Sequence, residues 1–216
     1  MKLYAAIVLI LLAFALPASA SVVTSLPGGT AVPMPAVNYF GGDPQTFGGV
    51  TWSSTNTSTQ DGSTFGYNGG YGFGENGFWS EALGPMAGVN DSFDAYGVSD
   101  TMTFTFATPV SGVGGFLNYV PGGSTPTIIQ ALDSLGNVIE SYNLTFLTGG
   151  ANDTGAFYGF LEGSPIIKSF TLTDNYVGIT NLTVLGTSSI PEPGNLALIG
   201  SGIALLGGLL RRKLGR

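Results

Sequence analysis

Away from its two ends, this chain offers carboxylates, hydroxyls, aromatic rings and a single lysine for chemistry. The 216-residue sequence contains no cysteine and no histidine. Disulfides, thiolate nucleophiles, the usual zinc ligands and every catalytic triad with a histidine base are therefore excluded. An acid-only glycosidase would need two facing carboxylates, about 5 Å or about 6.5–9.5 Å apart. Nothing in the sequence pairs any two of the candidates, so we expect solvated loop acids and no enzyme. These candidates are Asp43, Asp61, Glu75, Glu81, Asp91, Asp94 and Asp100.

Residues 64–79, TFGYNGGYGFGENGFW, alternate glycines with aromatic residues. Glycine lets the backbone bend tightly or approach a ligand, and aromatic faces stack on the apolar faces of sugar rings. One interpretation is a saccharide platform, and the other is that the rings fill the sandwich core while the glycines form its turns. A coplanar, exposed set would favour a carbohydrate-binding module, whereas burial would favour a structural role. The candidate stacking residues are Trp52, Tyr67, Tyr71, Phe73 and Trp79.

Paired Asn and Asp residues supply the hard oxygen ligands that Ca²⁺ prefers. The candidate ligands are Asn90, Asp91, Asp174 and Asn175. Such pairs also occur in ordinary Asx-turns, and the sequence has no EF-hand loop. Ca²⁺ is thus the one cofactor that the sequence leaves open.

Charge is distributed unevenly along the chain. Five of the six basic residues lie near the chain ends, which leaves Lys168 against twelve carboxylates in residues 21–190, a formal charge of −11. Such a body repels phosphate backbones, so nucleic acid is excluded as a partner. With no disulfides, the domain must be held by its core alone or by its core and a metal ion.

The first twenty residues have the pattern of a secretory signal peptide. Lys2 is a minimal positive region, residues 3–16 are apolar, and Ala18-Ser19-Ala20 is a small-residue cleavage site. We therefore expect an exported protein that begins at Ser21. The sequence divides into a signal peptide (1–20), one domain (21–187) and a C-terminal sorting segment (188–216).

The C-terminal segment has three parts in a fixed order. Pro191, Glu192 and Pro193 come first, followed by an apolar run over residues 196–210. The prolines keep the tripeptide extended and accessible to a protease. As a helix the run would span roughly 22 Å, short of the ~30 Å bilayer core, and would be a weak transmembrane anchor. A basic cluster follows and should stay cytoplasmic by the positive-inside rule: Arg211, Arg212 and Lys213.

These parts, in this order, resemble the PEP-CTERM sorting tail of Gram-negative bacteria. The resemblance implies cleavage near residues 191–193 by an exosortase, a membrane-embedded cysteine transpeptidase or protease. It also implies transient anchoring in the inner membrane and delivery to the cell surface or extracellular matrix. The alternative is a plain C-terminal anchor with an incidental Pro-Glu-Pro.

Between the two ends the sequence predicts an all-β fold. Residues 101–106, TMTFTF, alternate so that Met102, Phe104 and Phe106 share one buried face. Paired glycines predict a bulge in a strand over 113–119, residues 133–137 predict a hairpin loop, and residues 21–44 predict an edge strand. Turn signals recur every ~8–12 residues, as in an antiparallel β-sandwich. The predicted strands are 50–54, 101–106, 113–119, 127–132, 138–146, 156–161, 166–173 and 179–185.

The second half of the body also resembles the bodies of many PEP-CTERM surface proteins, which implies a jelly-roll or galactose-binding-like sandwich. Two functions therefore stay open. One is a structural or interaction protein held among exopolysaccharides in a biofilm matrix. The other is a carbohydrate-binding module that uses residues 64–79.

Overall fold

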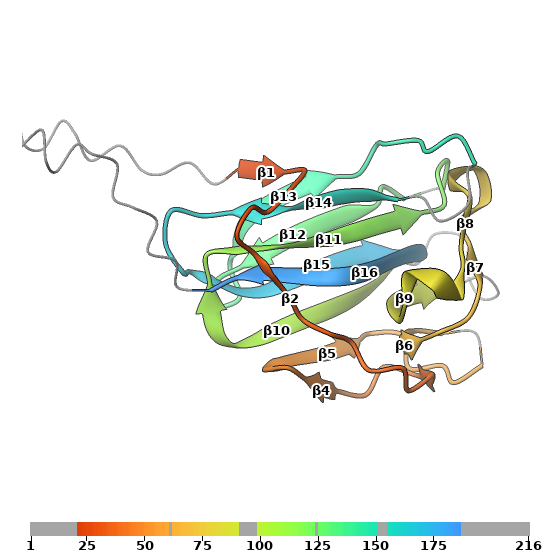
Figure 1. The fold of residues 1–216 in the computed structure, drawn as a ribbon, viewed down its shortest axis with the longest axis horizontal. Coiled ribbons are helices and arrows are strands. Elements are labelled where there is room, and N and C mark those ends of the chain that lie inside the picture. Colours follow the sequence, from red (N-terminus) through yellow and green to blue (C-terminus); the bar gives the residue numbers. More distant parts are fainter. Residues whose placement is uncertain (1–20, 61, 91–98, 124, 151–154, 187–216) are drawn as a thin grey trace, which may run out of the picture. The chain divides into compact units, whose positions relative to one another are not determined.

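The computed structural model describes residues 21–60, 62–90, 99–123, 125–150 and 155–186. Over these ranges the chain is all-β, with no α-helix, and its two large sheets are antiparallel (Figure 1). Within the same ranges no helix is long and apolar enough to cross a membrane. The predicted signal and transmembrane helices, the Pro-Glu-Pro motif and the basic cluster lie outside the described residues.

Most strands belong to one of two sheets. Sheet A has the order β1 (Ser21–Val23), β14 (Ala156–Leu161), β11 (Gly112–Tyr119), β16 (Tyr176–Leu185), β9 (Met86–Asn90), β6 (Thr64–Tyr67) and β3 (Tyr39–Phe40), with β2 (Thr30–Ala31) also paired to β16. Sheet B has the order β13 (Val138–Asn143), β12 (Ile128–Leu132), β15 (Ile167–Asp174), β10 (Asp100–Val110), β5 (Val50–Ser54) and β4 (Gln45–Phe47). A separate hairpin pairs β7 (Tyr71–Gly72) with β8 (Phe78–Trp79), and two single-turn 3₁₀ helices, η1 (Gly74–Asn76) and η2 (Glu81–Leu83), flank β8.

From β9 onward the chain crosses between the sheets at nearly every connection. As a result, the strands in the order β14-β11-β16-β9 of sheet A face the strands in the order β13-β12-β15-β10 of sheet B. Strands distant in sequence therefore become neighbours, as in interlocked Greek keys. The exception after β9 is the hairpin of β12 and β13, which stays within sheet B and turns through Asp133. The Asp133 carboxylate accepts hydrogen bonds from the main-chain N–H groups of Leu135 and Asn137. This confirms the hairpin predicted at residues 133–137.

The inner faces of the two sheets form the main core. Met102, Phe104 and Phe106 are buried while the threonines between them are not, which confirms the alternation predicted for residues 101–106. Phe160 of sheet A meets Phe170 of sheet B edge to face, with ring centroids 6.1 Å apart. The two sheets thus pack together as a β-sandwich. The bulge predicted at the paired glycines is also present, as a register shift between Gly114 and Phe116 against β16.

The N-terminal residues add to the edges and faces of sheet A. β1 pairs with β14 at one edge, which confirms the predicted edge strand, and β3 pairs with β6 at the other. β2 pairs with β16 at Thr183 and Val184, beyond the point where the ladder between β16 and β9 ends. Figure 1 shows this segment running across the sheet between the two edges.

Candidate functional site

The glycine and aromatic segment does not join the main core. Tyr71, Phe73, Trp79 and Met86 form a second buried cluster, against which Tyr67, Leu83, Val120 and Tyr176 pack. Val177 and Ile179 of β16 point into the main core. Side chains alternate along a strand, so Tyr176 and Gly178 lie on the opposite face of sheet A. The segment from β7 to η2 therefore covers the outer face of sheet A and gives it a core of its own.

A glycine in the sheet makes room for this cover. A β-carbon at Gly178 would lie 2.9 Å from the Phe73 ring, 2.9 Å from the Met86 methyl group and 3.0 Å from the Trp79 ring. Such distances are shorter than carbon atoms in van der Waals contact allow. Glycine at this position is thus required for the aromatic rings to sit directly on the sheet.

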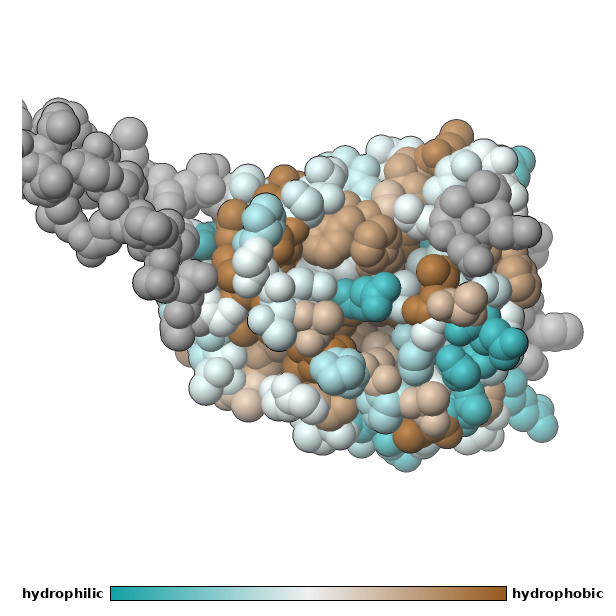
Figure 2. All heavy atoms as spheres, in the orientation of Figure 1, coloured by the Kyte–Doolittle hydropathy of each residue, from teal (hydrophilic) through white to brown (hydrophobic). Residues whose placement is uncertain are grey.

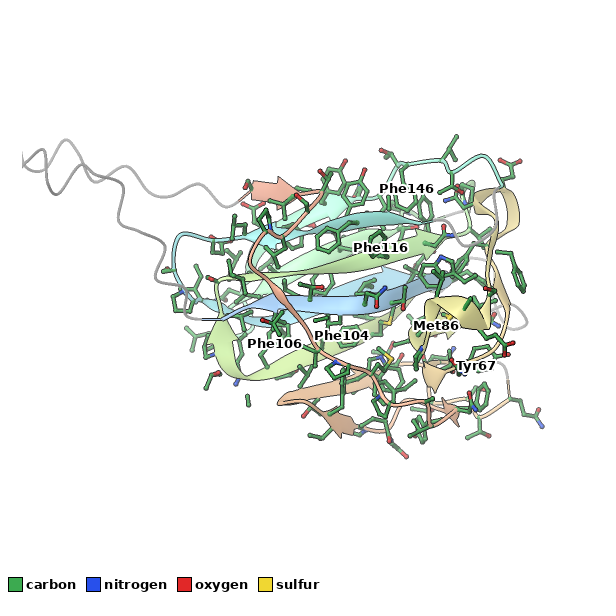
Figure 3. All side chains as sticks on the ribbon, in the orientation of Figure 1. Tyr67, Met86, Phe104, Phe106, Phe116 and Phe146 are labelled. Carbon is green, nitrogen blue, oxygen red and sulfur yellow. The ribbon has the colours of Figure 1, made fainter. Side chains whose placement is uncertain are left out.

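Beside this cluster lies a hollow of ≈ 250 Å³, here called the tyrosine hollow. Strands β3, β6, β7, β9 and β16 supply most of its wall, and Figure 3 shows the labelled Tyr67 and Met86 on this side of the molecule. Its lining residues are Phe40, Gln60, Gly62, Thr64, Tyr67, Gly70, Tyr71, Gly72, Asn90 and Tyr176.

Four of these lining residues form a continuous series of rings. Phe40 meets Tyr67 edge to face at 5.8 Å between centroids, and Tyr67 meets Tyr71 edge to face at 6.3 Å. Tyr71 then lies 5.1 Å from Tyr176 with the ring planes inclined by 33°. Each ring is held by the next, so the wall of the hollow is ordered before any ligand arrives.

Burial keeps the hydroxyls of Tyr71 and Tyr176 in the hollow neutral. Burial raises the pKa of Tyr71 well above its ordinary value, and the neighbouring Tyr176 raises that pKa further. Burial also raises the pKa of Tyr176, although the neighbouring Tyr71 hydroxyl partly opposes the increase. Among the described lining residues none is charged. The hollow therefore presents aromatic faces, amides and neutral hydroxyls.

Another cavity, of ≈ 510 Å³, is lined by residues 119–123, 125–127, 144, 145 and 147. Its described lining is mainly proline, glycine, threonine and aliphatic residues, with Tyr119 as the one aromatic ring. The Tyr119 hydroxyl already donates to the Phe146 carbonyl at 2.9 Å. The tyrosine hollow is thus the better candidate for recognition of a ligand with apolar faces and hydroxyl groups.

A flat stacking platform is one of the two interpretations of the sequence, and burial rules it out for three of the five candidate rings. Trp52 and Phe73 are 0% exposed and Trp79 is 2% exposed, so none of them can stack on a ligand. Trp52 belongs to the main core, where it stacks on Phe65 at 5.3 Å, whereas Phe73 and Trp79 fill the second cluster. Of the five candidates, only Tyr67 and Tyr71 line the hollow, where their rings meet edge to face. The alternative, that the rings of residues 64–79 fill the sandwich core, holds for Phe65, which lies in the main core with Trp52.

The Ca²⁺ ligands expected from the sequence are not a set of free oxygens. The Asp174 carboxylate accepts hydrogen bonds from the Thr127 hydroxyl and from the Asn175 N–H, and the Asn175 side-chain oxygen accepts from the Thr125 hydroxyl. Asn90 lies opposite Tyr176 in the sheet and lines the hollow, while Asp91 falls outside the described residues. In the described ranges no three acidic, histidine or cysteine side chains gather as a metal cluster.

Sequence reasoning missed several residues of the hollow: Phe40, Gln60, Thr64 and Tyr176. Thr64 and Gln60 lie in or near residues 64–79, whereas Phe40 and Tyr176 are brought there by strand pairings that no local pattern predicts. Tyr176 reaches the hollow because β16 pairs with β9, and Phe40 because β3 pairs with β6. The one available signal was the unusual density of aromatic residues, which located Tyr67 and Tyr71.

No family model matches the chain, and no curated protein matches it. Among solved structures, a family 32 carbohydrate-binding module from C. perfringens NanJ in complex with galactose matches at 15% identity and a TM-score of 0.37, over 62% of this chain and 92% of that one. The lectin binding domain of lectinolysin, a His 62 mutant complexed with Lewis b, matches at 9% identity and a TM-score of 0.33, over 48% and 72%.

The enzymatically active domain of tailspike protein 4 of bacteriophage CBA120 matches at 18% identity and a TM-score of 0.32. That match covers 65% of this chain and 20% of the tailspike chain. At such TM-scores these likenesses say nothing about the ligand of this chain.

Proposed function

We propose that this chain is an exported, exosortase-processed protein of the cell surface or extracellular matrix. In this proposal its sandwich is a non-catalytic interaction module that binds a neutral saccharide of the exopolysaccharide in the tyrosine hollow. The observation that carries the proposal is the series of four aromatic rings beside the polar side chains of Gln60, Thr64 and Asn90.

A saccharide matches this lining in both its parts. The C–H faces of a sugar ring pack on aromatic faces, and its hydroxyls exchange hydrogen bonds with amides and phenols. Phe40 is 42% exposed and Tyr67 is half-buried, so both rings have surface to offer a ligand. The hollow is small, and we expect it to take a single sugar residue of a longer chain.

Charge narrows the class of saccharide to neutral ones. The body carries a formal charge of −11, and no basic residue lines the described part of the hollow. A uronate or sulfated sugar would meet a negative field without a cation to receive it. We therefore expect neutral chains to bind and anionic chains to be rejected.

Matrix residence is supported by the order of parts at the C-terminus. The Pro-Glu-Pro motif, the short apolar run and the basic cluster resemble a sorting tail, and the first twenty residues resemble a signal peptide. The alternating strand order from β9 to β16 supports assignment of the sandwich to the jelly-roll class.

Burial of Trp52, Phe73 and Trp79 favours a second candidate function, a purely structural matrix protein without a saccharide site. In that case the second cluster exists only to cover sheet A. The two candidates differ in one observable, which is whether the exposed rings of the hollow affect polysaccharide binding.

The test is affinity electrophoresis of the full chain in gels that contain neutral or uronate-rich polysaccharides. Neutral chains should retard the wild type, and Tyr67→Ala or Phe40→Ala should each weaken binding by about 1 kcal/mol, roughly fivefold. Phe116→Ala is the matched control, because Phe116 is 45% exposed but is a residue of β11, away from the hollow (Figure 3). Equal retardation of all four proteins, or of none, would favour the purely structural role.

A further inference from the structure

A second polar site lies between the two sheets, outside the tyrosine hollow. Glu162 follows the last residue of β14 and is only 4% exposed. Its Oε1 atom is buried and has no hydrogen-bond partner. Its own main-chain N–H donates to the Ser111 carbonyl at 2.7 Å, which fixes the backbone at this point. A buried carboxylate oxygen without a partner carries a large desolvation cost and needs a compensating charge or donor.

Glu140 faces the same inter-sheet space from sheet B. It lies opposite Ala131 in the ladder between β12 and β13, and Ala131 is fully buried in the main core, so Glu140 also points inward. Two residues further along, Tyr142 stacks on Tyr158 of β14 with centroids 5.6 Å apart. The inward faces of β13 and β14 therefore meet across the sandwich.

The alternation of side chains along β14 places Glu162 on the inner side of sheet A. Tyr158 and Phe160 point inward from β14, and Glu162 continues their alternation just past the strand end. The proximity of Glu140 is one cause of the raised pKa of the Glu162 carboxyl, after burial itself. Two carboxylates thus share one space at the edge of the sandwich.

No cation of the described chain balances this pair. Lys168 is the one basic residue in the described ranges, and its ammonium group donates to the Ala107 carbonyl at 3.0 Å. Two carboxylates without a cation would be costly between the sheets, because each lies partly out of water and repels the other. A bound cation removes both costs at once.

We propose that Glu140 and Glu162 bind a divalent cation of the Ca²⁺ class between β13 and the end of β14. Carboxylates are the oxygen ligands that hard cations prefer, and water or main-chain carbonyls would complete the coordination. The ion would join an edge strand of sheet B to sheet A in a chain that has no disulfides. This site is separate from the saccharide proposal and from Asp174 and Asn175, whose oxygens already accept hydrogen bonds.

The test is Ca²⁺ titration of the purified full-length chain after treatment with a chelator, followed by thermal unfolding and calorimetry. Saturable binding should raise the midpoint of unfolding as the Ca²⁺ concentration rises. Glu162→Gln and Glu140→Gln keep the side-chain shape, and each should abolish this response. Glu81→Gln removes the same charge from an exposed position on η2 and should leave the response intact.

Stability without metal gives a second readout. Glu162→Gln should unfold at a higher temperature than the chelated wild type, because a neutral amide replaces a buried charge. The same Ca²⁺ response in all four proteins would place the ion elsewhere and overturn the proposal. No Ca²⁺ response in the wild type would also overturn it, and would leave Glu140 as an inward-pointing charge that protects an edge strand from pairing.

Discussion

At the scale of single residues, Asp174 shows how a side chain outside the hollow shapes it. Its carboxylate accepts hydrogen bonds from Thr127 and from the N–H of Asn175, in the tight connection between β15 and β16. The next residue along, Tyr176, is part of the ring series of the hollow. Asp174 is thus a positioning residue, since it fixes the turn from which Tyr176 projects.

Asp174 should also make stability depend on pH. Burial raises the pKa of its carboxyl, and hydrogen bonds from Thr127, Asn175 and Tyr176 partly oppose that increase. The folded pKa of Asp174 therefore lies above its unfolded value of about 3.9. The protonated carboxyl contributes its full stability below the unfolded pKa, and this contribution is lost as pH rises through the folded pKa. Asp174→Asn should remove this loss in urea unfolding measured across acidic pH.

Asp133 provides a control of opposite sign for the pH experiment. The hydrogen bonds from Asn137 hold the pKa of the exposed Asp133 carboxyl below its ordinary value. Its contribution to stability is therefore present above the unfolded pKa and lost as pH falls through the folded pKa. Asp133→Asn should reduce the loss of unfolding free energy as pH falls. The same change in pH dependence in the Asp133 and Asp174 variants would contradict the opposite signs of the two pKa shifts.

Phe104 tests the register of the central strand β10. Its ring is fully buried, and its ladder neighbours are Trp52 on β5 and Phe170 on β15. Phe104→Ala should cost about 3–5 kcal/mol in free energy of unfolding, because it leaves a cavity between these large side chains. Thr103→Ala, on the opposite face, should stay near zero. Equal losses from the two variants in urea unfolding would rule out this register.

At the scale of elements, the cover of sheet A rests on the fit between β16 and the segment from β7 to η2. Gly178→Ala would push a methyl group against Phe73, Trp79 and Met86. We expect a loss of about 1–3 kcal/mol in stability from this overpacking, together with weaker saccharide binding as Tyr71 moves with the cluster.

The matched control for Gly178 is Gly186→Ala. A β-carbon at Gly186 meets no atom within 4 Å, so little change in stability is expected. Thermal unfolding and the electrophoretic assay on the two variants give the comparison. If Gly178→Ala is as stable as Gly186→Ala, the rings do not rest on the sheet as described.

At the scale of the whole molecule, we expect the C-terminal segment to determine where the protein is delivered. Pro191→Ala together with Pro193→Ala should remove the extended conformation at the cleavage site without changing the anchor. We expect the variant to be exported but uncleaved, and to stay in the membrane fraction. Fractionation and mass spectrometry of the mature protein give the measurement. Processing and localisation like the wild type would make the Pro-Glu-Pro incidental.

The basic cluster should act differently from the prolines. Neutral residues in place of Arg211, Arg212 and Lys213 remove the charges expected to hold the end of the apolar run in the cytoplasm. The tail should then pass through the membrane, which gives release without correct processing. A tag placed after Ser21 would follow both variants in the same fractions.

The sequence by itself determined the features that depend on near neighbours. The alternation at Met102, Phe104 and Phe106 predicted a buried strand face, the glycines at 114 and 115 predicted a bulge, and residues 133–137 predicted a hairpin. Each signal lies within a few residues of the structure it specifies, because side-chain alternation and turn conformation are local properties of the backbone. Export and sorting also rest on local patterns, and they stay predictions.

Only the tertiary structure decided which surface each aromatic ring would cover. The local sequence around Phe73 and Trp79 does not distinguish burial in the main core from burial on the outer face of sheet A. Gly178, distant in the chain, leaves the space in which these rings pack on the outer face. Tyr176 likewise joins Tyr71 only because β16 crosses back beside β9. Pairings between strands far apart in sequence depend on the packing of the whole core, so no local pattern encodes them.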